Sequence, residues 1–354
     1  MRTLYRMARP LLFSLDAERA HALAAAWLRA SARLRPRPSL PSLPALRQTV
    51  LGLEFPSPVG LAAGMDKGEV VAPAWFGLGF GFVEIGSITP RPQPGNPKPR
   101  LFRLIEHGAI INRMGFNNAG ADAVAARLRA LPRQPGPVGI NLGKNKDTPN
   151  ERAAADYVST FRALAPHADY VAINVSSPNT PGLRALQQDL GALVGAVAVE
   201  RDALPRRVPL LVKLSPDEPS IEAIASAAVD AGADGIIATN TTLNRTAVDG
   251  HPRAGEAGGL SGAPLRAAAL RACARLHLHL GPRVPLIGVG GICTAEDAYA
   301  RIRAGASLIQ LYTALVYEGP GIARQITSGL ARLLERDRLT LSQAIGRDAK
   351  DLAG

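Results

Sequence analysis

Cysteine is scarce in this sequence, and its scarcity excludes two common ways of fixing a fold. Only two cysteines occur in 354 residues, and neither Cys273 nor Cys293 belongs to a CxxC pair or has histidine neighbours at metal-ligand spacing. We therefore expect neither a disulfide nor a bound metal, and a chain suited to a reducing cytoplasm.

Long apolar runs are absent as well. No stretch of about 18 uninterrupted apolar residues occurs, so the sequence predicts no membrane-spanning helix. Near the amino terminus, Asp16, Glu18 and Arg19 interrupt any apolar core of a signal peptide, and we expect none. Hydrophobic residues still make up 47% of the chain and charged residues 20%, which suits one large core.

Acidic residues are fewer than basic ones. The chain has 29 Asp plus Glu against 41 Lys plus Arg, a formal net charge of +12. Such an excess is typical of proteins that meet nucleic acid, an anionic membrane surface or anionic ligands, and it also arises from compositional bias alone. Charge by itself leaves these alternatives open.

The sequence is rich in a repeated alternation of short apolar runs with Ala/Leu/Arg-rich segments of helical period. Helices are expected after the strands, for example over 119–131, 220–231 and 294–304. Continuous apolar strands are typical of parallel sheets covered on both faces, and eight βα units over about 250 residues indicate a closed (β/α)8 barrel, the TIM barrel. The alternative, a doubly wound open sheet, should have GxGxxG after its first strand, where this chain has GLAAGMDKG. The eight predicted strands are 59–62, 82–85, 138–142, 170–175, 208–214, 235–238, 285–289 and 307–311.

Several segments fall outside this repeat. Residues 1–40 predict a pair of helices followed by a Pro-rich linker, and residues 46–58 a short hairpin that closes the bottom of the barrel. We therefore divide the chain into an amino-terminal segment, 1–40, and a barrel, 45–340. Inserts at 89–118 and 241–262 have lengths typical of functional lids. After Thr313 we expect one amphipathic helix and a short end.

The carboxyl ends of the strands carry the active site in barrels of this kind, and here those ends are polar. A single polar residue after a strand is more typical of a turn, but eight polar ends in succession indicate one site. In strand order these residues are Gly64 and Lys67; Ser87; Asn141; Asn174, Ser176, Ser177 and Asn179; Lys213; Thr239, Asn240 and Thr241; the turn GVGG; and Tyr312 and Thr313.

Two of these features indicate an anionic ligand. Lys213 lies in the apolar run LLVKLSP, where an unpaired ammonium is costly, and no acidic residue follows a neighbouring strand. A structural ion pair is the alternative. In the GVGG turn, Gly290 and Gly291 allow backbone N–H groups to approach an anion, and Thr313 lies after the next strand. Together they fit a phosphorylated heterocycle such as FMN.

Asparagines indicate the substrate. A neutral amide both donates and accepts, which matches the edge of a pyrimidinedione, and Lys67 offers a positive charge to a carboxylate. No histidine or carboxylate follows a strand as an evident base, so Ser177 is the candidate base by elimination. No His–Asp pair is placed to make it an acylating nucleophile, which argues against a hydrolase. The asparagines are Asn112, Asn141, Asn174, Asn179 and Asn240.

These motifs resemble those of the quinone-using dihydroorotate dehydrogenases, called class 2. The likeness runs from about Gly52 to Thr313 and includes AAGMDKG, GSITPRPQPGNPKPRLFRL, INRMGFNN, GINLGKNKDTP, INVSSPNTPGLR, ATNTT, GGLSG and GVGGI. The resemblance implies oxidation of dihydroorotate to orotate in pyrimidine biosynthesis, with a hydride passed to FMN N5 and electrons to a membrane quinone. It also implies that Ser177 removes the C5 proton, because class 1 members have cysteine there.

The resemblance assigns further roles residue by residue. Phe116 and Thr180 would flank the exit route of the proton, and His21 and Arg103 would contact the quinone. FMN would contact Ala63, Gly64, Ser87, Asn141, Asn174, Lys213, Thr239, Gly262, Gly291, Tyr312 and Thr313. Substrate would contact Lys67, Asn112, Arg113, Met114, Gly115, Phe116, Asn174, Asn179, Asn240 and Thr241. Ser87, Thr313 and the pair Gly68–Glu69 depart from the usual family residues.

The amino-terminal segment has two apolar stripes among arginines, typical of helices that lie in a lipid headgroup layer or that pack on a barrel. The resemblance favours the membrane, peripherally and on the cytoplasmic face of the inner membrane, with the basic charge facing anionic lipid. We then expect no nucleic-acid partner. We also expect the protein to be a monomer. We expect deletion of residues 1–40 to impair quinone turnover and to leave flavin reduction intact.

Two rival functions remain at this point. The first is an FMN barrel that reduces uridine in tRNA, which would need a basic carboxyl-terminal domain and a catalytic cysteine, and neither Cys273 nor Cys293 ends a strand. The second is a non-catalytic barrel that binds phosphate or a membrane surface. A flavin spectrum in the purified protein separates this last alternative from both enzymes.

Overall fold

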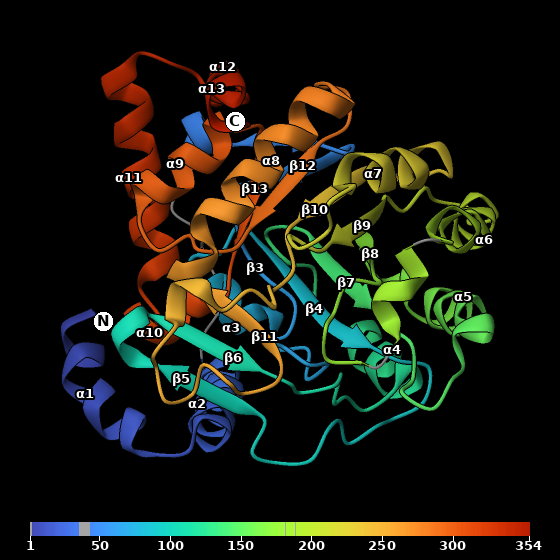
Figure 1. Ribbon diagram of the computed structural model, residues 1–354, viewed down its shortest axis with the longest axis horizontal. Helices are drawn as coiled ribbons and strands as arrows, with labels where there is room; N and C mark the ends of the chain where they lie inside the picture. The colour runs from blue at the N-terminus through green and yellow to red at the C-terminus, as the bar shows by residue number, and fades with distance from the viewer. Residues whose placement is uncertain (1, 35–42, 181, 188) are drawn as a thin grey trace.

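A computed structural model describes residues 2–34, 43–180, 182–187 and 189–354, and its centre is a closed barrel of eight parallel strands (Figure 1). The barrel closes because β13 pairs with β3, which confirms the predicted (β/α)8 fold and excludes the open sheet. Almost every strand residue is buried, as the continuous apolar runs predicted. The strands are β3 (Val59–Leu61), β4 (Phe82–Ile88), β7 (Val138–Leu142), β8 (Tyr170–Asn174), β9 (Leu210–Leu214), β10 (Gly235–Ala238), β12 (Leu286–Val289) and β13 (Ala306–Leu311).

Helices surround the barrel and bury their apolar faces on it (Figure 1). In α9, Thr294 caps the first turn in a reciprocal pair with Asp297, and Ala298 and Ile302 are buried one turn apart. The surrounding helices are α3 (Ala72–Gly77), α4 (Ala121–Arg129), α5 (Ala153–Leu164), α6 (Leu190–Asp202), α7 (Ile221–Asp230), α8 (Arg266–Leu280), α9 (Ala295–Arg303) and α11 (Ile322–Asp337).

The predicted hairpin forms and closes one end of the barrel. Its strands, β1 (Gln48–Val50) and β2 (Leu53–Phe55), pair antiparallel. Phe55 packs edge-on against Phe82 at the start of β4, with ring centroids 5.2 Å apart. The amino-terminal end of the barrel is therefore filled with apolar side chains, and the opposite end is left for the site.

The two inserts, whose lengths are typical of lids, contain a sheet that the sequence did not predict. They join into one antiparallel sheet in the order β11-β6-β5, made of β5 (Leu101–Leu104), β6 (Ala109–Asn112) and β11 (Gly259–Gly262). The pairing of Gly259 with Asn112 ties the second insert to the first. Each insert thereby gains backbone hydrogen bonds that a lone loop would lack.

Two helices precede the barrel, α1 (Arg2–Ser14) and α2 (Ala17–Leu34), and they lie beside β5 and β6 (Figure 1). Asp16 turns the chain between them, because its carboxylate accepts the N–H groups of Glu18 and Arg19 at 3.0 Å. Most of the predicted linker lies outside the described residues. Among the helices that the structure describes, none is both long and apolar enough to cross a membrane.

The expected carboxyl-terminal end, one helix and a short tail, was wrong. The chain after β13 forms α10 (Thr313–Glu318), α11, α12 (Leu341–Ala344) and α13 (Ala349–Leu352). Short helices of this kind carry too few turns for a readable period. They are held by local caps and ion pairs, such as the Arg303–Asp348 pair, whose Nη2–Oδ1 distance is 2.6 Å.

Candidate active site

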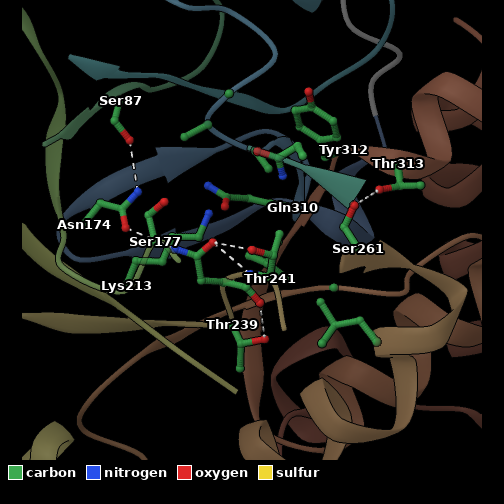
Figure 2. Close-up of a pocket in the computed structure, with 18 of the residues that line it drawn as sticks. Ser87, Asn174, Ser177, Lys213, Thr239, Thr241, Ser261, Gln310, Tyr312 and Thr313 are labelled. Carbon is green, nitrogen blue, oxygen red and sulfur yellow. Dashed lines mark hydrogen bonds between the residues drawn. The ribbon is translucent and has the colours of Figure 1, made fainter. Parts of the chain in front are cut away.

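The polar strand ends converge on one cavity at the carboxyl end of the barrel (Figure 2). Nearly every predicted site residue lines it, although lining a cavity does not test the role of any of them. The predicted residues on its wall are Ala63, Gly64, Lys67, Ser87, Asn112, Met114, Gly115, Phe116, Asn174, Ser177, Asn179, Lys213, Thr239, Asn240, Thr241, Gly262, Gly291, Tyr312 and Thr313.

Two of the residues predicted to contact FMN or substrate are not on the wall. Asn141 is fully buried behind it, where its Oδ1 accepts from the hydroxyl of Ser87. The guanidinium of Arg113 donates to Glu256 at 2.6 Å and stacks over Phe102 at 4.6 Å. The structure thus places the Arg113 side chain apart from the cavity, and its contact with substrate stays a prediction.

Amide side chains on the cavity wall hold one another in fixed orientations. Asn174 Nδ2 donates to Ser87 Oγ at 3.0 Å, and Asn174 Oδ1 accepts from Asn240 Nδ2 at 3.1 Å (Figure 2). Asn240 Nδ2 also donates to Ser176 Oγ at 3.0 Å, and Ser176 donates in turn to the carbonyl of Lys213 at 2.6 Å. This network fixes which atom of each amide faces the cavity.

Three buried amide oxygens of residues on the same wall have no donor among the described residues. They are Oδ1 of Asn117, Oδ1 of Asn179 and Oε1 of Gln310, and sequence analysis did not single out Asn117 or Gln310. Asn179 uses its Nδ2 to donate to Asn112 Oδ1 at 2.9 Å, which leaves its oxygen without a partner. Buried acceptors of this kind are normally satisfied, so all three indicate a ligand that carries N–H or O–H groups.

Lys213 has the buried environment predicted for it, with 6% of its surface exposed. Burial lowers the pKa of its ammonium, and the carboxylate of Glu84 opposes that shift. Glu84 lies inside the barrel on β4 and accepts from Asn141, Tyr170 and Gln310 at 2.9, 3.1 and 2.7 Å. Sequence analysis missed it because only strand ends were searched, although a glutamate inside the apolar run FVEIGSI is itself a signal.

Ser177 is buried on the loop after β8. Its Oγ accepts the N–H of Asn179 at 3.3 Å. Within the described part of the chain, neither a histidine nor a carboxylate hydrogen-bonds to this hydroxyl, so it has none of the partners of an acylating triad.

The turn after β12 lines the cavity and requires glycine at two positions. Gly290 and Gly291 have φ values of +108° and +72°, which favour glycine, and a Cβ on Gly291 would lie 2.4 Å from the Cα of Arg266. Behind the turn, the buried guanidinium of Arg301 donates to the carbonyl of Gly290 at 2.9 Å. Across the cavity, Thr313 Oγ1 lies 2.8 Å from the hydroxyl of Ser261, which sequence analysis also missed.

The sequence favours small buried cysteines, but Cys293 lines this cavity and is only partly buried. It lies in the loop after β12 rather than at a strand end, as the sequence indicated. Cys273 is buried in α8, and the structure pairs neither cysteine in a disulfide. No cluster of metal-binding side chains occurs in the described ranges.

A second cavity lies between the amino-terminal helices and the barrel. His21 and Arg103 line it, as does Tyr312, which therefore belongs to both cavities. Its remaining wall is mostly apolar, including Leu12, Phe13, Ala20, Ala24, Trp27, Leu28, Trp75 and Leu315. His21 Nε2 lies 3.4 Å from Lys67 Nζ, and the charge of Lys67, with burial, lowers the histidine pKa to about 3. His21 is therefore neutral at physiological pH.

The sequence model described as dihydroorotate dehydrogenase matches residues 45–334, which include the barrel and both cavity-forming inserts. The chain belongs to the dihydroorotate dehydrogenase family. The family match begins before β1 and ends in α11.

Relatives place this member of the dihydroorotate dehydrogenase family near the quinone type. The dihydroorotate dehydrogenase (quinone) of Anaeromyxobacter sp. (strain Fw109-5) is 55% identical over 351 residues, which cover 96% of each chain. The protein of the same name from Roseiflexus sp. (strain RS-1) is 53% identical over 361 residues and is covered to 99%, against 98% of this chain. The likeness therefore extends through the amino-terminal helices.

A solved structure of the family has the same fold. The ligand-free DHODH from Eimeria tenella superposes with a TM-score of 0.88 at 40% identity, over 94% of this chain and 99% of that one. The complex of that enzyme with ferulenol gives a TM-score of 0.87 at 39% identity, over 94% and 95% of the two chains.

Proposed function

We propose that this chain oxidises dihydroorotate to orotate in pyrimidine biosynthesis and passes the electrons, through FMN, to a membrane quinone. The observation that carries the proposal is the meeting of two different cavities at Tyr312, one polar and one mostly apolar, in a chain with quinone-type relatives. A polar ring substrate and an apolar acceptor need two such environments.

The polar cavity has the features that FMN requires. Lys213 offers a cation to the flavin ring, the turn at Gly291 and the hydroxyl of Thr313 suit its phosphate, and the free Oε1 of Gln310 suits a ring N–H. Ala63, Gly64, Ser87, Asn174, Thr239, Gly262 and Tyr312 would complete its contacts, with Asn141 behind Ser87. When bound, FMN supplies the acceptor for the hydride that leaves the substrate ring.

The residues of the chain hold the substrate and remove its proton. Lys67 would pair with the carboxylate, while Asn179 and Asn240 would bind the ring amides through groups that face the cavity. Asn112, Asn174, Thr241 and the segment from Met114 to Phe116 would complete this pocket. Ser177 Oγ would take the C5 proton, and Phe116 and Thr180 would flank the path by which that proton leaves.

The apolar cavity would receive the quinone, with His21 and Arg103 as its polar contacts. The apolar residues Met7, Leu11, Leu23 and Trp27 of α1 and α2 are 50–76% exposed, and Leu23 and Trp27 also line the apolar cavity. We assign residues 1–40 to this quinone and membrane segment and residues 45–340 to the FMN barrel. The exposed apolar face and the net charge of +12 support peripheral binding to anionic lipid on the cytoplasmic face of the inner membrane.

Anaerobic mixing of the purified protein with dihydroorotate tests the proposal directly. The flavin absorbance should bleach and then recover when a quinone is added, but not when fumarate is added. Colourless protein that cannot be reconstituted with FMN, or flavin that dihydroorotate does not bleach, would contradict the proposed function.

A further inference from the structure

We infer that α2 also positions the substrate site, with Glu18 acting through Arg100 and Asn96 on the loop that carries Ser177. This inference rests on the proposed function. It gives the amino-terminal helices a part in the dihydroorotate half-reaction as well as in quinone binding, so deletion of residues 1–40 would also slow flavin reduction, unlike the expectation from the sequence.

Glu18 and Arg100 form a nearly buried, two-pronged ion pair. The carboxylate in the first turn of α2 accepts from Arg100 Nε at 3.1 Å and from Arg100 Nη2 at 2.7 Å. The side chains are 15% and 6% exposed, so water competes little for this pair. A forked guanidinium–carboxylate contact fixes orientation as well as distance.

The remaining nitrogen of Arg100 holds the first insert. Nη1 donates to the carbonyls of Pro94 and Asn96 at 2.6 and 2.8 Å. The guanidinium therefore joins α2 to the backbone of the insert between β4 and β5. Because all three nitrogens of the guanidinium are used, loss of the carboxylate would leave Arg100 without its counter-charge in a nearly dry site.

Asn96 carries this contact to the catalytic loop. Its Nδ2 donates to the carbonyl of Asn179 at 3.0 Å and to the carbonyl of Arg113 at 2.9 Å. Asn179 is the residue whose N–H reaches Ser177 Oγ at 3.3 Å. A Cβ at Gly115, two residues after Arg113, would lie 2.7 Å from the Asn96 amide. Asn96 thus hydrogen-bonds both to the loop after β8 and to the segment after β6, which together form part of the proposed substrate pocket.

A second residue on the same face of α2, one turn later, also contacts the proposed substrate pocket. His21 follows Glu18 by three residues, so the two side chains project to one side of the helix. His21 Nε2 lies 3.4 Å from Lys67 Nζ, the cation proposed for the substrate carboxylate. The position of α2 therefore bears on both the cationic and the amide sides of the pocket.

The test uses the full-length holoenzyme with orotate as the probe, its dissociation constant read from the change in flavin absorbance. Glu18→Gln is the test variant and Glu18→Asp the conservative rescue. Arg29→Gln is the matched control, because it removes another ion pair between α2 and the barrel, the exposed contact with Glu69, without touching Arg100. The KM values for dihydroorotate and for the quinone are measured on all variants.

For Glu18→Gln we expect the orotate dissociation constant and the KM for dihydroorotate to rise about tenfold, the effect of breaking one coupled contact network. The KM for quinone should stay at the wild-type value, Glu18→Asp should recover most of the affinity, and Arg29→Gln should match wild type. An unchanged orotate affinity in Glu18→Gln overturns the inference. So does an equal loss in Arg29→Gln, or a loss shared by substrate and quinone, because either would mean that α2 acts only as packing.

If Glu18→Gln does not fold, Arg100→Lys at unchanged melting temperature carries the test, and wild-type orotate affinity in Arg100→Lys overturns the inference. Wild-type protein that neither binds orotate nor bleaches with dihydroorotate would refute the proposed function instead. That result is distinguishable because it precedes any variant.

Discussion

The two cavities share the ring of Tyr312, but their walls come from different parts of the fold. Strand ends build the polar cavity, and amide side chains such as Asn174 and Asn240 fix one another there. Helices α1 and α2 build much of the apolar cavity by lying against the barrel. The closed sheet fixes the shape of the polar cavity. The apolar cavity exists only while α1 and α2 stay against the barrel. Substitutions in one cavity should therefore have effects that differ from those of substitutions in the other.

The largest expected effect is on the polar cavity. Ser177→Ala should slow flavin reduction by dihydroorotate about 10²- to 10⁴-fold, the usual contribution of a positioned general base. Orotate affinity should stay near wild type because Ser177 is not among the proposed carboxylate or amide contacts. Stopped-flow absorbance of the flavin measures the rate, and an unchanged rate would remove Ser177 from the role of base.

A change confined to the apolar cavity should leave substrate chemistry alone. Ala24 lines that cavity, and Ala24→Phe would fill part of it. We expect the KM for quinone to rise about tenfold, since a misplaced ring both blocks contacts and strains its neighbours. Steady-state assays with varied quinone test this, with single-turnover flavin reduction as the control. Slower flavin reduction in this variant would mean that the two cavities are not separable.

The pH dependence of orotate binding should show whether Lys67, in the polar cavity, pairs with the carboxylate of the ligand. Burial lowers the pKa of Lys67 to about 8, with Arg100 adding to the shift and Glu18 opposing it. Lys67 pairs with a carboxylate only while protonated, so affinity should be greatest below pH 8 and fall up to about tenfold per pH unit above it. Titrations between about pH 7 and pH 9 measure this. Lys67→Met should bind weakly with a flat profile, and a flat profile in wild type would contradict the assignment.

The smallest effect concerns the outer face of the amino-terminal helices. Leu11 on α1 is 72% exposed, and Val199 on α6, on the other side of the molecule in Figure 1, is 69% exposed. Leu11→Ser should weaken binding to anionic vesicles a few-fold, whereas Val199→Ser should not, because only the first side chain would enter the lipid. Vesicle co-sedimentation at low and high salt compares them. Equal losses would place the membrane contact elsewhere.

The fold could be predicted from the sequence because its signal is repeated. Each barrel strand is a short apolar run with a polar residue after it, and β7 and β10 have the predicted bounds. The end of β4 was placed too early because the strand continues through Gly86 and Ser87. The sheet made by the two inserts was missed, since pairing between segments far apart in sequence leaves no local pattern.

The site residues that directly follow strands could be predicted from the sequence. Those that lie within a strand, inside the barrel, could not. Glu84 and Gln310 point inward from the middle or end of a strand, and no rule based on strand ends selects them. Arg113 was carried over with the motif INRMGFNN, but its guanidinium binds Glu256 and does not line the cavity. Glu18 and Arg100 were visible as charges, but their meeting depends on how α2 lies on the barrel.

Tyr312 lines two compartments, one among the strand ends and one among the helices. If the two compartments hold the proposed ligands, a ligand in one has no need to leave before the other arrives. Orotate should then compete with dihydroorotate and not with the quinone, and blockers of the two compartments should occupy one molecule at the same time. One tyrosine side chain would thereby separate the site of a water-soluble metabolite from that of a lipid.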